Sequence, residues 1–321
     1  MKAQTLREIA GPLAAMLIVV AFVALTTPSF RDLGNLNNLI LQVSIIAIVA
    51  VGSTIVIFAG GIDLSPGSAI ALMTVVFASA VKLWGVPFFL AMGMTVVIGL
   101  LLGLLNGALT AYLRIPSFIT TLAALSAFRG VAFMFNNGSP VSQVSLLLEP
   151  IFYGRLFGLP LPLYYVVAIY ALGFWFLRYT AAGRSVYAVG GNPNAARLSG
   201  IDVRRTQLLA FAIAGVCAAF GAILMAARLN SGSPNYGVGL ELSAIAAAVI
   251  GGASLAGGRG NILNSAIGAM TIVVVQNGLN LNAVPTSVQN VVTGAIIVLA
   301  VGIDMWRAEI TRFLSVMLNR N

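Results

Sequence analysis

The feature that most constrains this chain is the length of its uncharged apolar stretches. Crossing the hydrocarbon core of a bilayer takes about 20 consecutive residues without uncompensated charge. Between Glu8 and Arg31 lie 22 uncharged residues, and between Arg259 and Asp304 lie 44. Over all 321 residues 60% are hydrophobic and 8% are charged, against roughly 45–50% and about 25% in soluble domains. These stretches exclude a soluble globular protein and predict an all-α polytopic membrane protein.

The uncharged intervals also predict the number of spans. The interval 260–303 has Asn280, Asn282 and Pro285 near its middle, which indicates two helices joined by a tight turn. With 117–135, which is counted despite Arg129, the chain is expected to have about ten transmembrane helices. The remaining intervals are 9–30, 33–62, 64–81, 83–113, 156–177, 206–227 and 242–258. The intervals 64–81 and 242–258 are short for a straight crossing, so whether they cross fully stays open.

The distribution of Lys and Arg predicts the orientation. Cytoplasmic loops carry an excess of positive residues, and ten spans with both termini cytoplasmic put twelve cations inside, four outside and Arg129 within a span. The outer cations are Arg31, Lys82, Arg155 and Arg228. The inner ones are Lys2, Arg7, Arg114, Arg178, Arg184, Arg197, Arg204, Arg205, Arg259, Arg307, Arg312 and Arg320.

This orientation implies a single transmembrane domain over 1–321, with a long cytoplasmic loop at about 179–206 and a periplasmic loop at about 136–160. Nine or eleven spans would instead put the arginine-rich 178–205 segment or the C-terminal cations outside. The first apolar segment could be a signal peptide, but 22 uncharged residues favour an uncleaved first helix.

The residue inventory argues against an enzyme. The chain has no His, which removes the commonest general base and metal ligand. Neither Lys2 nor Lys82 stands in a phosphate-binding Gly-Lys-Ser/Thr setting, no Gly-x-Ser-x-Gly elbow is present, and the single Cys217 cannot form an intrachain disulfide. We therefore expect no cofactor and no metal, and any nucleotide energy must come from another chain. The net charge of +9 is too dispersed for a nucleic-acid partner.

The loop at about 179–206 contains signals for one short helix. Asn192 is expected to be the N-cap, Pro193 the first helical residue and Gly200 the stop. Two turns of helix are not stable alone in water, so the helix needs a contact. It either packs on the ends of the protein's own helices or docks into a groove on a cytoplasmic partner.

Two glycine-rich segments interrupt the apolar sequence, Gly60–Gly67 and Gly251–Gly260. In the first, two glycines end a span and Ser65–Pro66 is expected to cap the next. Asp63 is either a cap or inner-surface charge, or a gating contact. Glycine-broken helices in both halves are typical of transporters built from internal repeats.

Polar residues within spans are costly and face the bundle interior or a wet cavity. Arg129 either snorkels outward or lines a pathway, and the amides either bond neighbouring helices or contact substrate. Gly99, Gly103 and Gly107 form one stripe expected to pack closely against another helix. The polar candidates are Gln42, Ser44, Asn106, Thr120, Thr121, Ser126, Arg129, Gln276, Asn277 and Asn280.

The chain resembles the permease subunits of bacterial ATP-binding-cassette sugar importers of the ribose type, in register from about residue 30 to 304. The matching segments are Asn35–Leu39 with Gln42, Gly61–Ser65 with Gly67–Ser68, Arg129–Gly130 with Asn137–Val141, Gly183–Arg184 with Gly190–Asn192 and Ala195–Ile201, and Glu241–Leu242 through Gly257–Gly258 with Gly260. One departure is Ser243, where many relatives have Asp.

The resemblance implies a permease in the bacterial inner membrane. It would pair with itself or a sister permease, take a monosaccharide such as a ribose-like pentose or a hexose from a periplasmic binding protein, and be driven by a separate ATPase. It implies that the loop after the sixth span couples to the ATPase, through Gly190, Asn192, Ala195, Ala196, Arg197, Leu198 and Gly200. The expected gating residues are Gly61, Asp63, Ser65, Gly257 and Gly258, and the candidate path residues are Gln42, Asn106, Ser126, Arg129, Gln276 and Asn277.

Three alternative functions compete with this one. The same machinery could import a polyol or a furanosyl signal molecule. An ion-coupled secondary transporter would need carboxylates at mid-span, whereas all eight acids are expected at span ends or in loops. An intramembrane enzyme is disfavoured because there is no His and no acid pair within one helical turn.

Overall fold

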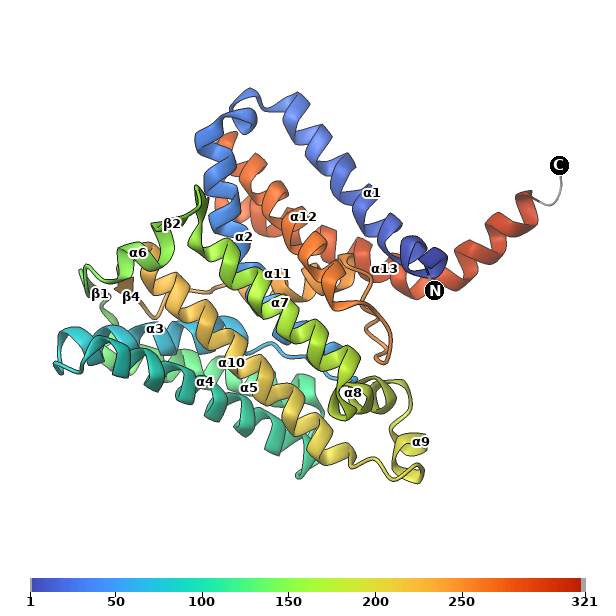
Figure 1. Cartoon of the computed structure of the whole chain (residues 1–321), viewed down its shortest axis with the longest axis horizontal. Coiled ribbons are helices and arrows are strands. Elements are labelled where there is room, and N and C mark those ends of the chain that lie inside the picture. Colours follow the sequence, from blue (N-terminus) through green and yellow to red (C-terminus); the bar gives the residue numbers. More distant parts are fainter. Residues whose placement is uncertain (1, 319–321) are drawn as a thin grey trace.

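The computed structural model describes the backbone of residues 2–318 and the side chains of residues 9–302. The terminal cations Lys2, Arg7, Arg307, Arg312 and Arg320 lie outside the described side chains. Within this part the chain is helical, with four two-residue strands (Figure 1). In order, the elements are α1 (Lys2–Thr26), η1 (Pro28–Arg31), α2 (Leu33–Phe58), α3 (Pro66–Lys82), α4 (Phe88–Ala111), α5 (Ser117–Met134), η2 (Phe135–Gly138), β1 (Val141–Ser142), α6 (Leu148–Tyr153), β2 (Arg155–Leu156), β3 (Leu159–Pro160), α7 (Leu161–Tyr179), α8 (Ala181–Gly191), α9 (Pro193–Leu198), α10 (Val203–Leu229), β4 (Ser231–Gly232), α11 (Leu240–Ile250), α12 (Ile262–Leu281) and α13 (Thr286–Leu318).

The apolar helices agree with the uncharged intervals. Among the described residues, seven helices are long and apolar enough to cross a bilayer, namely α1, α2, α4, α5, α7, α10 and α12. Three shorter apolar helices are α3, α11 and the described part of α13, Thr286–Gly302. The predicted turn near Pro285 is confirmed, since α12 ends at Leu281 and α13 begins at Thr286.

The centre of the fold is built on α2 and α10. In α2 almost every side chain from Ser44 to Phe58 is buried, because other helices surround its second half. The predicted glycine stripe of α4 is confirmed, and its partner is α10. A Cβ atom built on Gly103 would lie 2.3 Å from the carbonyl oxygen of Phe211, and one on Gly99 would lie 2.5 Å from that of Gly215. The two backbones approach closely because neither surface has side chains there.

Both halves contain a long helix, an extended segment and a short apolar helix. In the first half, α2 is followed by residues 59–65 and then α3, and in the second half α10 is followed by residues 230–239 and then α11. The two units run in opposite directions, because residues 59–65 leave α2 near α8, whereas β4 pairs with β1 at the other end of the bundle. The prediction of glycine-broken or short helices in both halves is confirmed.

The two ends of the bundle have different structures. At one end lie α6, the β1–β4 pair and the β2–β3 hairpin, and at the other lie α8 and α9 (Figure 1). The side chain of Lys82 donates a hydrogen bond to the carbonyl of Ser142, which ties the end of α3 to β1. The predicted loop at 136–160 is therefore a structured cap.

Candidate functional site

The short helix α9 has the predicted boundaries. The Asn192 side-chain oxygen accepts hydrogen bonds from the backbone nitrogens of Asn194 and Ala195, each at 3.0 Å. Pro193 is the first helical residue, and Gly200 adopts a left-handed φ of 81° after the helix. The loop also contains a second helix that the sequence pattern did not predict, α8, whose N-cap Thr180 accepts from the nitrogen of Gly183 at 3.0 Å.

One side of α9 packs on the protein and the other is exposed. Ala196 is buried in a small cluster with Val189 and Val203, whereas Leu198 is 90% exposed. The exposed surface of α9 thus includes Leu198, while Ala196 holds the helix against the protein. Gly190, Asn192, Ala195 and Arg197 belong to the same α8–α9 unit.

Three segments that are distant in sequence meet next to α9. A Cβ atom built on Gly190 would lie 1.9 Å from the carbonyl oxygen of Phe58 and 2.7 Å from the nitrogen of Gly258. A Cβ atom on Gly257 would lie 2.7 Å from the carbonyl oxygen of Gly190 and 2.9 Å from the Cα atom of Gly60. The nitrogen of Gly258 donates to the carbonyl of Phe58 at 3.0 Å. We call Gly60, Gly190, Gly257 and Gly258 the glycine junction.

Aromatic side chains border the glycine junction. The rings of Phe58 and Tyr187 stack with centroids 4.9 Å apart, and the Tyr187 hydroxyl donates to the carbonyl of Gly260 at 3.3 Å. The backbone contact and the stacked rings connect α2, α8 and the segment before α12. The end of α8 therefore cannot move without disturbing the end of α2.

Asp63 and Ser65 form a buried network beside this junction. The Asp63 carboxylate accepts hydrogen bonds from the Ser65 nitrogen at 2.9 Å and the Ser65 hydroxyl at 2.7 Å, and Asn106 Nδ2 donates to that hydroxyl at 2.8 Å. All three side chains are buried. Asp63 is 5% exposed, so it is not an inner-surface charge.

The prediction that Ser65–Pro66 caps the next span is half right. Pro66 is the first residue of α3, but the hydroxyl of Ser65 makes no capping bond to that helix. It donates to Asp63 instead, because the buried carboxylate is a stronger acceptor for it. The neighbouring Gly61–Ile62 stretch is fixed to α5, since the Ile62 nitrogen donates to the Ser117 hydroxyl at 3.0 Å.

The two short helices α3 and α11 meet at their N-termini. A Cβ atom on Gly67 would lie 2.0 Å from Glu241 Oε2 and 2.2 Å from the carbonyl oxygen of Gly237. Glu241 Oε1 accepts from the Gly239 nitrogen at 3.3 Å, while Oε2 is buried and has no partner among the described residues. The carboxylate thus lies between two helix N-termini, where the helix dipoles favour a negative charge.

Arg129 fixes the extended segment that leads into α11. Its Nη1 donates to the carbonyl of Tyr236 at 2.7 Å and to that of Pro234. It also attracts the carboxylate of Glu241. The guanidinium therefore points to segment 230–239, a contact that neither of the two alternatives for Arg129 had included.

Of the other predicted path residues, some bond neighbouring helices and the rest lie at a cavity or on an exposed surface. Gln276 Nε2 donates to the hydroxyl of Ser243 at 3.3 Å, and Asn277 exchanges hydrogen bonds with Asn35 at 2.9 and 3.0 Å. Gln42 lines a cavity of about 200 Å³ near α6, and Ser126 lies on the exposed side of α5. The structure thus brings Asp63, Ser65 and Asn106 together in one hydrogen-bonded network.

Sequence reasoning missed Glu241 as a site residue and the role of segment 230–239. It placed all eight acids at span ends or in loops, and Glu241 does begin a helix. The sequence did not show that the start of α11 lies far from both ends of the bundle. The available signal in the sequence was the pair of glycines at 237 and 239, which indicates that the chain is not helical there. Both glycines have a left-handed φ in the structure.

Known transport permeases are similar to this protein over nearly the whole chain. The family described as "Branched-chain amino acid transport system / permease component" matches residues 35–301. The ribose import permease protein RbsC of Escherichia coli (strain K12) is 39% identical over 91% of this chain and 92% of its own length. RbsC of Bacillus subtilis (strain 168) is 38% identical over 92% of both chains.

A xylose relative is almost as similar. The xylose transport system permease protein XylH of Haemophilus influenzae is 35% identical over 91% of this chain and 94% of its own length. No solved structure matches the chain. The match over residues 35–301 and the identities above 30% over nine-tenths of the chain show that the protein belongs to this family of transport-system permease components.

Proposed function

We propose that this chain is the membrane-spanning permease of an ATP-binding-cassette importer for a monosaccharide, a ribose-like pentose or a hexose. A periplasmic binding protein delivers the sugar, a separate ATPase supplies the energy, and a second permease, identical or a sister chain, completes the path in the bacterial inner membrane. The observation that carries the proposal is the capped and exposed helix α9, joined directly through α8 to the glycine junction. The sugar class rests on the ribose and xylose permeases among the relatives.

The topology proposed for this function has ten crossings with both termini cytoplasmic. In this arrangement α8 and α9 face the cytoplasm, and α6 with the β1–β4 pair faces the periplasm. The positive charges near α8 and α9 support this orientation by the positive-inside rule. The segments 59–65 and 230–239 then enter the membrane from opposite sides, and each half crosses fully by adding an extended stretch to a short helix.

The proposed path for sugar follows the meeting point of α3 and α11. At 1.5 Å per residue, Glu241 lies about 14 Å from the end of α11, and Gly67 lies about 22 Å from the end of α3. Both positions are therefore inside the bilayer. Arg129 and Glu241 are partly exposed and Asn235 is exposed, and polar side chains at this depth face a water-filled passage rather than lipid. A second permease across from this surface would complete the passage, with Gln42 near its outer end.

In the proposed mechanism, closure of the ATPases on ATP moves α9. Because α8 packs on the glycine junction, the movement reaches the ends of α2 and of the segment before α12. The switch is a two-state rearrangement of packed helices. No covalent chemistry occurs in this chain.

The test is to replace Arg197 and Leu198 by Asp in the full permease. We expect the ATPase subunits to be lost on purification and sugar-stimulated ATP hydrolysis to fall to background. Arg31→Asp, which makes an arginine-to-aspartate change at the opposite end of the bundle, is the control and should change neither. Unchanged co-purification and hydrolysis in the double variant would show that the coupling assignment is wrong.

The substrate class is tested separately with the periplasmic binding protein of the same transport system. Pentoses, hexoses and polyols are screened for a shift in its melting temperature, and positive compounds are measured for uptake by proteoliposomes containing this permease and its ATPase. A shift with a monosaccharide supports the proposal. A response to polyols or furanosyl signal molecules alone would replace the substrate class and leave the transport mechanism intact.

A further inference from the structure

A cavity of about 440 Å³ lies beside α9, within the roughly 300–1,000 Å³ typical of ligand pockets. Its walls come from three places: the end of α2, the turn between α4 and α5, and the α9–α10 connection. Three arginines are among its lining residues, Arg114, Arg197 and Arg204, and no Asp or Glu is. We call it the arginine cavity.

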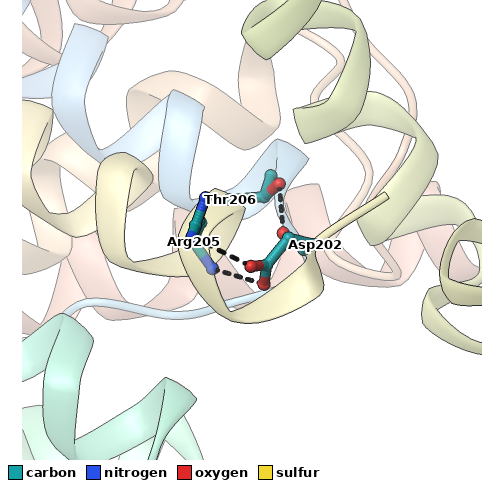
Figure 2. Close-up of polar contacts among 3 residues, drawn as sticks. All are labelled: Asp202, Arg205 and Thr206. Carbon is teal, nitrogen blue, oxygen red and sulfur yellow. Dashed lines mark hydrogen bonds and ion pairs between the residues drawn. The ribbon is translucent and has the colours of Figure 1, made fainter. Parts of the chain in front are cut away.

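The three arginines have no acidic partner in the part of the chain that the structure describes. The ion pair observed there joins Asp202 to Arg205, with 3.1 Å between Oδ2 and Nε, and Arg205 does not line the cavity. Figure 2 shows Arg205 held by Asp202, which also accepts from the Arg205 nitrogen and, through its carbonyl, from Thr206. Arg204, the preceding residue, instead places its guanidinium 5.9 Å from the centre of the Tyr112 ring.

Three arginines without an acid around one cavity give it a positive potential that attracts anions. The stacking of Arg204 on Tyr112 leaves its N–H groups available while it restricts the side chain. Arg114 adopts a left-handed φ of 57° in the turn between α4 and α5, which for a residue with a side chain is uncommon and needs support from its surroundings. An arginine-lined cavity without acidic residues suits carboxylate or phosphate groups.

The inner wall of the arginine cavity is the moving part of the proposed mechanism. Val56, Ala59, Gly60 and Gly61 line it, and Gly60 is a member of the glycine junction. An occupant would therefore touch the end of α2 directly, in addition to the path through α9 and α8. A group that enters or leaves the cavity with the catalytic cycle would act on the junction at the point where α2 ends.

We propose that the arginine cavity receives an acidic side chain of the partner ATPase, so that the permease accepts part of the ATPase while α9 contacts another part. The proposal rests on the function proposed above. Two features favour a protein carboxylate over a lipid headgroup. Residues of α9, which lies at one end of the bundle (Figure 1), form one wall. The buried end of α2 forms another, so an occupant would contact residues that other helices of the bundle surround.

The first experiment compares charge reversals in the full importer purified in detergent. Arg114→Glu and Arg204→Glu are expected to weaken retention of the ATPase about tenfold and to reduce its salt dependence, because each replaces an attraction by a repulsion. Arg205→Glu is the matched control: it makes the same charge change one residue from Arg204, on an exposed side chain outside the cavity. Equal retention by all three variants would overturn the proposal.

Comparison with Leu198→Asp separates this proposal from the function on which it rests. If Leu198→Asp removes the ATPase while Arg114→Glu and Arg204→Glu do not, the coupling helix stands and the arginine cavity does not receive the ATPase. If neither Leu198→Asp nor the arginine variants affect the ATPase, both proposals fail.

A second experiment does not depend on the folding of charge-reversed variants. Gln207, which lines the cavity, is replaced by the photo-reactive residue benzoylphenylalanine, and the importer is irradiated with and without ATP. The proposal expects a cross-link to an ATPase peptide that contains Asp or Glu, and replacing that acid by Lys should restore ATPase retention to Arg114→Glu. A cross-link to phospholipid alone, or to an ATPase segment without an acid, would overturn it.

Discussion

Asp63 illustrates how a charged residue is accommodated at the interior of this protein. It is almost fully buried, and one of its carboxyl oxygens accepts hydrogen bonds from the backbone nitrogen and the hydroxyl of Ser65. Ser65 then passes the interaction to Asn106 on α4. The network gives the buried backbone nitrogen of Ser65 an acceptor in the stretch between α2 and α3.

We predict opposite outcomes for two substitutions of Asp63. Asp63→Asn keeps an acceptor oxygen for both donors of Ser65 and should leave the melting temperature of the purified permease close to that of the wild type. Asp63→Ala leaves a buried nitrogen and a buried hydroxyl without their acceptor, which costs about 1–3 kcal/mol for each group. This variant should therefore have a clearly lower melting temperature. Thermal stability in detergent is measured by size-exclusion chromatography after heating, and an Asp63→Ala protein as stable as Asp63→Asn would contradict the network.

At the scale of elements, close packing between α4 and α10 depends on glycine. Gly99 and Gly103 on α4 face Gly215 and Phe211 on α10 without intervening side chains. Glycine in a helix interior costs roughly 0.5–1 kcal/mol relative to alanine, so at these positions the cost is offset by contact between the two backbones. At Gly93, also on α4, a Cβ atom would have no other atom within 4 Å, and there glycine brings no such contact.

Substitutions on α4 should therefore have opposite signs. Gly93→Ala should leave stability unchanged or raise it by up to about 1 kcal/mol, because alanine favours the helix. Gly103→Ala should lower it by roughly 1–3 kcal/mol, because the new methyl group overlaps the carbonyl of Phe211 and forces the helices apart. The two melting temperatures are compared in the same detergent, and a loss of similar size in both variants would mean that α4 does not need its close approach to α10.

The sequence predicts the long helices well because each must be apolar over a full crossing of the bilayer. Charged residues then indicate where each helix ends. The caps of α9 are also local, so Asn192, Pro193 and Gly200 could be read directly. The helix α8 was missed because its stability depends on packing of Val186 and Val189, which are buried. Nor does charge spacing reveal that the carboxylate of Glu241 meets the N-terminus of α3, since the two positions are brought together by the opposite directions of the two halves.

For the whole molecule, the glycine junction connects the proposed ATPase contact to the proposed sugar path. Its members come from the end of α2, the end of α8 and the segment before α12, which are far apart in the chain. Only Gly191 and Asn192 separate α9 from Gly190, the nearest member of the glycine junction in the chain. A movement of α9 therefore reaches the junction without a long chain of intermediate contacts.

Gly190 and Gly191 provide a matched pair to test this connection. A methyl group at Gly190 would lie 1.9 Å from the carbonyl oxygen of Phe58, whereas one at Gly191 would meet no atom within 4 Å. We expect Gly190→Ala to lower sugar uptake by proteoliposomes at least about tenfold, because the backbones that close the junction can no longer touch. It should still retain the ATPase on purification, since the exposed residues of α9 are unchanged, and Gly191→Ala should behave as the wild type in both measurements. Normal uptake by Gly190→Ala, or an equal loss in Gly191→Ala, would show that close backbone contact at the glycine junction is not required for transport.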